Sequence, residues 1–229
     1  MKTLHLIIAE SALETIPKEI INHPQILKDA KRRGKDPRFM ILDRSRHHEA
    51  MKNLKDSHKR GRPDIVYLSL QVTQYTPMNS VGLLRTYIHT IDNKVIFIDP
   101  TTRIPRNYNN FIGLIEQLYK LSRVPPTGKP LLTLRNMNLK ELIDYINPSV
   151  VILLDDVKGI EITFRDLVNQ IINLEYPCII VGGFPHGEFS EFTYRIVDKV
   201  YKIGKYVYST FLIISKLITY IENRIGLEE

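Results

Sequence analysis

The sequence lacks several residues and patterns that mark particular classes of protein. Among 229 residues there are one cysteine and no tryptophan. A single cysteine excludes an intramolecular disulfide and a cysteine-rich zinc site. Cys178 lies inside an apolar run, which indicates a small buried side chain rather than a nucleophile. No apolar run approaches membrane-spanning length, and the short run after Lys2 stops at Glu10, unlike a secretory signal. We therefore expect a soluble, cytoplasmic protein with no membrane partner.

The familiar nucleotide and hydrolase motifs are also missing. The sequence has no Gly-x-x-x-x-Gly-Lys-Ser/Thr, no Gly-x-Gly-x-x-Gly and no Gly-x-Ser-x-Gly. The adjacent His47 and His48 are the one pair that invites a metal reading. Neighbouring positions on a helix point about 100° apart, and no second cluster follows at ligand spacing. We expect no bound metal.

Positive charge, by contrast, is in excess. Lys and Arg number 32 against 25 Asp and Glu, which gives a formal net charge of +7. Such a balance suits a polyanionic partner, although many basic proteins bind none. One concentration of charge is the stretch 52–62, and another is the loop 101–111, where arginines accompany a tyrosine and amide side chains. Arginine can hold phosphates and can stack on unpaired bases. An exposed polar turn without a ligand remains the alternative for this loop.

Short apolar runs alternate with amphipathic stretches along the chain. The runs 150–154 and 178–181 are typical of buried parallel strands. The alternation predicts an α/β fold with a mostly parallel sheet. The run 65–72 also predicts a strand, with Arg62 and Asp64 at its entrance. We expect one domain over 1–229, with a possible loop break at the proline-rich residues 125–130.

The strand at 178–181 ends abruptly in glycines. Gly182 and Gly183 follow it directly, and Gly187 comes after an aromatic residue, a proline and a histidine. Glycine permits backbone turns and close approaches that a side chain would prevent. Ligands of open α/β sheets bind outside the carboxyl ends of strands. This stretch is therefore a candidate ligand site, although a tight strand-to-helix turn with no ligand would leave the same pattern.

Five short motifs occur in a specific order over nearly the whole chain. The motifs are Gly61-Arg62-Pro63-Asp64-Ile65, Thr76-Pro77-Met78-Asn79, Arg103-Ile104-Pro105-Arg106 after Pro100, Phe111-Ile112-Gly113-Leu114, and Gly182-Gly183-Phe184-Pro185-His186-Gly187. Together they resemble the family of ribosome-biogenesis methyltransferases that methylate N1 of a pseudouridine in small-subunit ribosomal RNA, within the SPOUT superfamily, and the chain length resembles the archaeal members.

The resemblance implies a fold, a cofactor and partners. It implies a SPOUT-type sheet with helices on both faces and a C-terminal trefoil knot, a homodimer, ribosomal RNA as substrate and S-adenosylmethionine held by the knot loops. The cofactor positions it implies are Val157, Gly182, Gly187, Ile203, Gly204, Lys205, Tyr206, Val207 and Tyr208. The RNA-binding positions it implies are Arg62, Arg103, Arg106 and Asn110, with Asp64 holding Arg62 in place.

One residue and one loop depart from the family pattern. Asn110 stands where the family often has arginine, so one cation for RNA is missing and a neutral hydrogen-bonding side chain replaces it. The loop 204–208 also differs from the usual Asn-Tyr-Pro-Leu type.

The chemistry assigns Arg62 and Asp64 as catalytic residues with different roles. A cationic Arg62 would stabilise the anion that develops as N1 loses its proton. Asp64 is two residues away and is a better salt-bridge partner than a direct base. A non-catalytic RNA-binding assembly factor would use the same arginines, and only cofactor binding at the glycine loop separates the two hypotheses.

Overall fold

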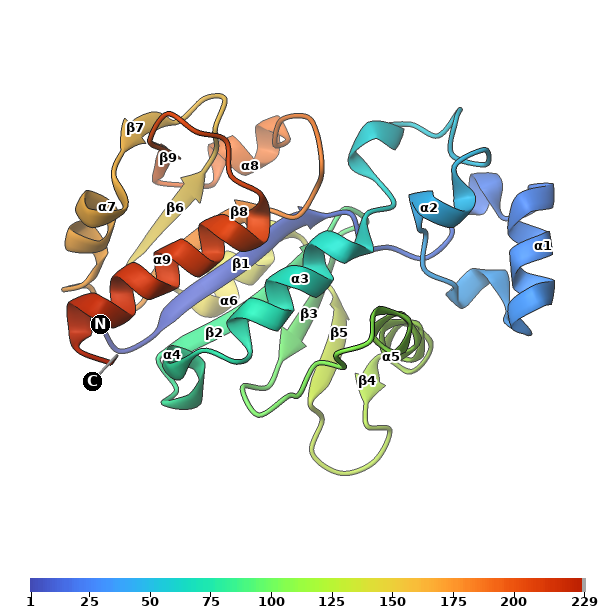
Figure 1. The fold of residues 1–229 in the computed structure, drawn as a ribbon, viewed down its shortest axis with the longest axis horizontal. Coiled ribbons are helices and arrows are strands. Elements are labelled where there is room, and N and C mark those ends of the chain that lie inside the picture. Colours follow the sequence, from blue (N-terminus) through green and yellow to red (C-terminus); the bar gives the residue numbers. More distant parts are fainter. Residues whose placement is uncertain (228–229) are drawn as a thin grey trace.

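Strand β1 (Leu4–Ser11) lies near the middle of a nine-stranded sheet around which the rest of the chain is arranged (Figure 1). The protein is represented by a computed structural model that describes residues 1–227. On one side β1 pairs in parallel with β2, and on the other in parallel with β8. The α/β class and the mostly parallel sheet predicted from the sequence are therefore confirmed.

The sheet has a parallel half and an antiparallel half. Parallel pairing extends from β2 through β1, β8, β6 and β9 to β7, whereas β2, β3, β5 and β4 pair antiparallel. The β2–β3 hairpin turns at Asp92 and Asn93, as the sequence indicates, with Asn93 at φ 55°. In spatial order the strands are β4 (Arg123–Val124), β5 (Leu132–Asn136), β3 (Lys94–Ile98), β2 (Leu84–Thr90), β1, β8 (Pro177–Gly182), β6 (Val150–Leu154), β9 (Lys199–Ile203) and β7 (Ile160–Ile162).

The central strands are apolar on both faces because helices cover both faces of the sheet. Alternate side chains of a strand point to opposite sides. Leu6 and Ile8 of β1 therefore enter the larger core, and Ile7 and Ala9 enter the smaller one. The same alternation continues in β6 and β8, where Cys178 is fully buried, as predicted.

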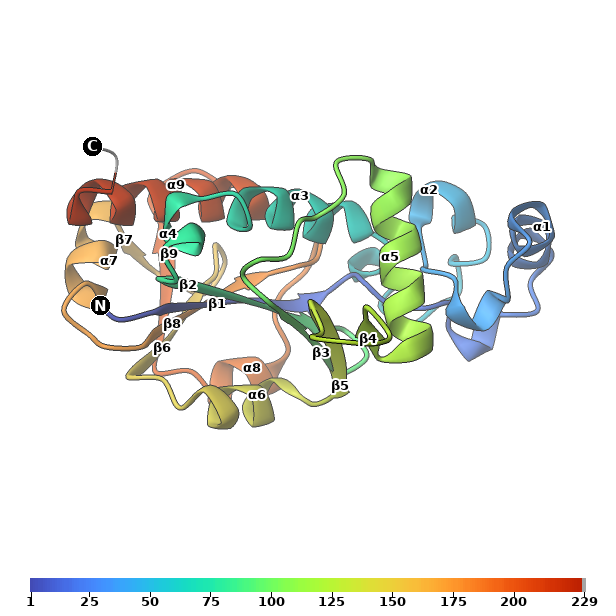
Figure 2. The ribbon, with the colours of Figure 1, turned by 90° about the horizontal axis from the view of Figure 1, so that it is seen from below.

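Figure 2 shows the two helical layers edge-on. The layer that covers the larger core contains α3, α5, α7 and α9, and the other contains α6 and α8. Local signals start these helices, among them a capping box in which Asn138 and Glu141 bond reciprocally. The helices are α1 (Pro24–Arg33), α2 (Arg44–His47), α3 (Pro63–Thr73), α4 (Pro77–Ser80), α5 (Tyr108–Leu121), α6 (Leu139–Ile146), α7 (Phe164–Ile171), α8 (Glu191–Arg195) and α9 (Thr210–Ile225).

Residues 12–62, between β1 and α3, form a lobe with its own small core at the end of the molecule away from the chain termini (Figure 1). The lobe consists of α1, α2 and short 3₁₀ turns at Lys18–Ile20, Pro37–Phe39 and Ser57–Lys59. Glu116 of α5 ties the lobe down, because its buried carboxylate accepts from Arg33 (2.7 Å) and from Lys35.

The strand predicted over 65–72 is wrong, because these residues form helix α3. Pro63 occupies the first helical turn with Asp64 beside it, which is a typical helix start. The buried side chains Val66, Ser69, Leu70 and Thr73 follow the helical period. The run of β-branched and aromatic residues concealed this spacing. Residues 125–130 lie in the loop that connects β4 to β5, two antiparallel strands that pair with each other in the sheet.

Candidate functional site

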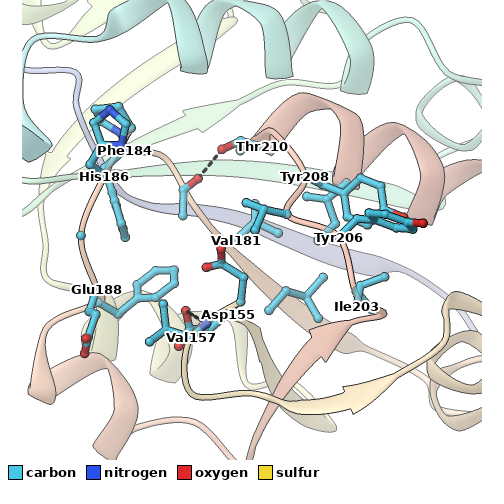
Figure 3. A pocket seen from close by; sticks show the side chains of 18 residues that line it. Asp155, Val157, Val181, Phe184, His186, Glu188, Ile203, Tyr206, Tyr208 and Thr210 are labelled. Atoms are coloured by element: carbon cyan, nitrogen blue, oxygen red, sulfur yellow. Dashed lines mark hydrogen bonds between the residues drawn. The ribbon is translucent and has the colours of Figure 1, made fainter.

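A cavity of about 500 Å³ opens at the carboxyl ends of β6 and β8, where the sequence placed its candidate ligand site (Figure 3). Leu154 ends β6, Gly182 ends β8, and Ile203 ends β9 beside them. Of the predicted cofactor positions, Val157, Gly182, Gly187, Ile203, Tyr206, Val207 and Tyr208 line the cavity, whereas Gly204 and Lys205 are not among its lining residues.

The glycines leave no room for side chains on this wall. A Cβ on Gly183 would lie 2.2 Å from Oγ of Ser11 and 2.8 Å from its Cα, so the backbones of β1 and β8 touch here. Gly182 would place a Cβ 3.2 Å from the rings of Phe184 and Phe189. Gly187 has φ +100°, a conformation that other residues rarely adopt. Gly182 and Gly187 therefore contribute only backbone to the cavity lining, whereas Gly183 lies next to the lining and packs against β1.

The turn after β6 is fixed by Asp155. Its carboxylate accepts from the backbone N–H of Val157 (3.3 Å) and of Lys158 (3.0 Å), and from the hydroxyl of Tyr194 (2.9 Å). Burial and the neighbouring Asp155 carboxylate raise the pKa of Tyr194, so its hydroxyl stays protonated and continues to donate. These bonds hold the turn that carries Val157, which lines the cavity and is 58% exposed.

The start of α9 closes the opposite side. Oγ1 of Thr210 donates to the carbonyl of Gly182 (2.7 Å), which ties the first turn of α9 to the end of β8 (Figure 3). Thr210, Ile213 and Asp155 line the cavity, yet the sequence analysis did not assign them. For Asp155 and Asp156 a signal existed, because they directly follow an apolar strand just as Gly182 does.

On the other side of the glycine loop, Arg62 stands immediately before α3. Its Nε and Nη2 bond both carboxylate oxygens of Asp64, at 2.8 and 2.7 Å, so the predicted pair is present. This bond to Asp64 raises the pKa of Arg62, which stays cationic. Its side chain remains 41% exposed, so the charge can meet a solvent-borne anion.

Helix α3 also holds the arginine loop. Tyr67 and Gln71, which lie four apart on one face of α3, donate to the carbonyls of Arg106 and Pro105. Tyr75, in the turn just after the helix, donates to the carbonyl of Ile104 (2.9 Å). The loop is therefore fixed by its backbone while the side chains of Arg103 and Arg106 stay exposed.

The first turn of α5 completes the surface that carries Arg62, Arg103, Arg106 and Asn110, which we call the arginine side. Asn107 caps the helix by accepting from the N–H groups of Asn109 (2.9 Å) and Asn110 (3.2 Å), and Asn110 is exposed. Tyr108 donates to Asp43 (2.9 Å), and its ring meets that of Tyr67 edge-on. Burial raises the pKa of Tyr108, and Asp43 raises it further. The sequence analysis assigned no role to Tyr67 or Asp43.

Neither a metal cluster nor a membrane helix is present in the described part of the chain. Residues 1–227 contain no group of three His, Cys, Asp or Glu side chains arranged to hold a metal ion, and none of their helices could cross a membrane. His47 is fully buried, with Nδ1 accepting from the N–H of Asp43 (3.0 Å) and Nε2 3.3 Å from Asp29. Its surroundings are those of a structural histidine.

The fold and the cavity define an α/β protein with a candidate small-molecule site at the carboxyl ends of parallel strands, beside an arginine-bearing surface. Residues 6–222 match the model of the EMG1/NEP1 methyltransferase family. The chain belongs to this family, as the sequence motifs indicated.

Curated relatives and a solved structure are similar to this chain over nearly its whole length. The chain is 44% identical over 223 residues to "Ribosomal RNA small subunit methyltransferase Nep1" of Pyrobaculum islandicum, covering 97% of this chain and 99% of that protein. It is 43% identical over 221 residues to the protein of the same name in Staphylothermus marinus, covering 96% and 95%. The crystal structure of Archaeoglobus fulgidus Nep1 bound to S-adenosylhomocysteine matches with a TM-score of 0.86 and 32% identity, covering 99% and 100%.

Proposed function

We propose that this protein is an S-adenosylmethionine-dependent methyltransferase that methylates N1 of a pseudouridine in small-subunit ribosomal RNA, and so acts in small-subunit biogenesis. The observation that carries the proposal is the cavity at the carboxyl ends of parallel strands, which a glycine-containing loop borders, in a chain of the EMG1/NEP1 family. The relatives are named as methyltransferases of small-subunit rRNA, and the Archaeoglobus structure holds the demethylated cofactor.

The cavity fits an adenosyl cofactor in size and chemistry. Its volume of about 500 Å³ lies within the usual range for small-molecule sites. Apolar side chains of Leu154, Ile203 and Ile213 offer a surface for a flat ring, and the exposed carboxylate of Asp156 lies at the turn after β6. The glycines let backbone N–H and C=O groups approach a ligand closely. We propose that the 203–208 segment, Gly204 and Lys205 included, completes the cofactor loops.

When bound, the cofactor supplies the electrophilic methyl group on its sulfonium. The tasks left to this chain are to position the base and to favour loss of the N1 proton. Arg62, cationic and partly exposed, stabilises the negative charge that develops on the base. Asp64 orients the guanidinium through two hydrogen bonds and acts as a positioning residue. A base in an RNA loop is the easiest to unstack into such a site.

The exposed side chains Arg103 and Arg106, with Asn110, are proposed to contact the RNA backbone. They stand on a loop and a helix start that α3 and Asn107 hold in place. An ordered loop loses little conformational freedom when it binds, which favours affinity. Cationic contacts of this kind make RNA binding strongly salt-dependent.

The assembly, the chain topology and the location complete the proposal. We propose a homodimer, supported by side chains that are apolar yet exposed in the C-terminal part, Ile160 at 73% and Tyr206 and Val207 at 75% each. Light scattering should then give twice the chain mass. We also propose that the C-terminal segment forms the trefoil knot of SPOUT proteins, and that the protein acts in the cytoplasm on ribosomal precursors.

Methyl transfer to a short RNA hairpin tests the activity directly. One hairpin carries pseudouridine in its loop and a matched hairpin carries uridine. The expected result is transfer of the cofactor methyl group to the pseudouridine hairpin alone, with mass spectrometry locating it on N1. Transfer to neither hairpin by protein that binds S-adenosylhomocysteine would favour the second candidate, a non-catalytic rRNA-binding assembly factor, because the same arginines serve both.

A further inference from the structure

Glu10 is held in an unusual backbone conformation at the end of β1. Its φ is 48°, in the left-handed region that residues other than glycine seldom occupy. It lies at an irregularity in β1, just past the last pair with β8, Ala9 with Gly182, and two positions further on Ala12 donates to the carbonyl of Gly183 (2.9 Å). Such outliers persist only where the surroundings hold them, and they concentrate at functional positions.

The Glu10 carboxylate connects three parts of the chain. Oε1 accepts from the backbone N–H of Ser190 (2.9 Å) and from the hydroxyl of Thr193 (2.8 Å), both at the start of α8. Oε2 accepts from Nζ of Lys59 (2.8 Å), which belongs to the lobe. Burial would raise the pKa of Glu10, but the hydrogen bonds from Lys59 and Ser190 outweigh it and hold that pKa below its usual value. The group is therefore a carboxylate at neutral pH.

Lys59 reaches from the lobe onto the cavity loop. Besides Glu10, its Nζ donates to the carbonyl of Glu188 (2.5 Å) and lies 4.2 Å from the centre of the Phe184 ring. Phe184 and Glu188 both line the cavity. The ammonium is mostly buried, with its side chain 12% exposed. His58 packs beside it, 3.1 Å from where a Cβ of Gly187 would be. One lysine thus holds both ends of the loop 184–188.

The same short segment leads directly to the arginine side. Three residues after Lys59, the backbone N–H of Arg62 donates to the carbonyl of Ala12 (3.2 Å), and Gly61 accepts from the N–H of Arg44 (2.8 Å). The side chain of Arg60 is paired with Glu14. Residues 59–62 are therefore fixed to the lobe and to β1 at several points. A shift of this segment would move the cavity loop and Arg62 together.

We infer that Lys59, held by Glu10, is a positioning residue that makes binding of the cofactor and of RNA mutually favourable. RNA bound at Arg62 and cofactor bound against the loop 184–188 both stabilise the same arrangement of the segment 59–62, because Lys59 connects that segment to the loop. Coupling of this kind is reciprocal, so the cofactor must strengthen RNA binding by the same factor. The inference rests on the proposed function, because it takes the cavity as the cofactor site and Arg62 as an RNA contact.

The test measures S-adenosylhomocysteine affinity by calorimetry, with and without a saturating RNA hairpin that carries pseudouridine. For the wild type we expect the hairpin to lower the Kd about tenfold, within the usual range of allosteric coupling. In Lys59→Met the Kd without RNA should rise about tenfold, and the hairpin should no longer change it. Lys59→Arg, which keeps the charge and the donors, should restore most of the coupling.

Two controls separate this role from general effects. Lys55→Met removes the same charge from an exposed side chain four positions earlier in the chain. Its Kd for S-adenosylhomocysteine, with and without the hairpin, should equal that of the wild type. Arg33→Met removes a buried partner of Glu116 far from the cavity and should lower thermal stability without changing the Kd. Suppose that Lys59→Met and Arg33→Met lose the same thermal stability and raise the Kd for S-adenosylhomocysteine by the same factor. Lys59 would then act only through stability, and the inference would be overturned.

The remaining outcomes distinguish this inference from the function on which it rests. Wild type that binds no S-adenosylhomocysteine would overturn both. Wild type that binds it with the same Kd whether or not the hairpin is present would overturn the coupling alone and leave the proposed function standing. Coupling retained in Lys59→Met would likewise overturn only the role of Lys59.

Discussion

The cavity and the arginine side are neighbours that are built from different materials. The cavity is lined by apolar side chains and by the backbone of Gly182 and Gly187, and the carboxylate of Asp155 is already engaged by three donors. The arginine side presents exposed cationic side chains, with Arg62 beside Asp64. A cavity of this kind selects a ligand by shape, whereas exposed cations attract a polyanion by charge. A change on one side should therefore leave binding at the other side largely intact when each ligand is measured without the other, and this expectation can be tested.

The largest effect is expected for Arg62→Met. Loss of the cation that stabilises the developing anion should lower kcat for methyl transfer about 10²–10³-fold, as removal of a single transition-state donor does elsewhere. Turnover at saturating hairpin and cofactor checks this. Affinity for S-adenosylhomocysteine should stay unchanged, because the cavity wall is not touched.

A matched control exists in the lobe. Arg38 pairs with Asp36 at the same spacing of two residues, on the exposed surface. Arg38→Met should leave kcat unchanged. If Arg62→Met weakened RNA binding but kept kcat at saturation, Arg62 would be an RNA contact and nothing more.

Next in size is the effect of Gly182→Val. A Cβ added to Gly182 would lie 3.2 Å from the rings of Phe184 and Phe189, which line the cavity. Valine adds two further methyl groups beside these rings. Affinity for S-adenosylhomocysteine should fall about 100-fold, which corresponds to about 2.7 kcal/mol, and calorimetry can measure it. RNA affinity without cofactor should be unchanged.

Gly113→Ala is the control for this change. Gly113 lies within α5, and an added Cβ meets no atom within 4 Å. Alanine there should raise the free energy of unfolding by up to about 1 kcal/mol through helix propensity alone. Unchanged cofactor binding by Gly182→Val would mean that the cavity does not hold the cofactor.

A smaller effect is expected for Arg106→Ala. RNA affinity should fall about tenfold at low salt, and the slope of log K against log salt should lose about 0.7–0.9, the contribution of one phosphate contact. Filter binding over a salt series measures both. Arg165→Ala, an exposed change on α7 of the same charge, should leave the slope as it is. Equal losses of RNA and cofactor affinity in Arg106→Ala would contradict the separation of the two sides.

The smallest effect concerns the sheet beneath both sites. Burial and the nearby Arg85 lower the pKa of His5 from 6.5 to about 4, so the unfolded chain takes up a proton before the folded one does. Stability from this group is present above pH 6.5 and is lost as the pH falls from 6.5 towards 4. With an allowance for screening of a partly exposed ring, the loss is about 1 kcal/mol. Urea unfolding of wild type and His5→Gln at pH 7 and pH 4.5 should show it in the difference.

How far the sequence predicts the protein depends on which interactions set each feature. Buried parallel strands such as 150–154 and 177–182 are visible because both faces are apolar. The place of the cavity could be predicted because glycines at the end of a buried strand mark a turn or a close approach at the carboxyl edge of the sheet. The helix at 63–73 was missed, because its apolar residues surround it on more than one side and hide the helical period.

Contacts between distant residues are outside the reach of a single sequence. Nothing in the order of residues shows that Tyr67, Gln71 and Tyr75 reach the carbonyls of 104–106, or that Thr210 reaches Gly182. The pair of Arg62 and Asp64 could be predicted because they are only two positions apart. The bond between Lys59 and Glu10 spans 49 positions and could not.

The position of β1 has a consequence for synthesis of the chain. Of the nine strands of the sheet, β1 leaves the ribosome first and becomes the middle one, and one of its two neighbours, β8, begins only at Pro177. Until then one edge of β1 lacks its partner, while side chains such as Leu6 and Ile8, fully buried in the finished fold, await cover. Pairings between such distant segments close slowly. The nascent protein therefore passes through a long interval in which one edge of its central strand is open to wrong partners.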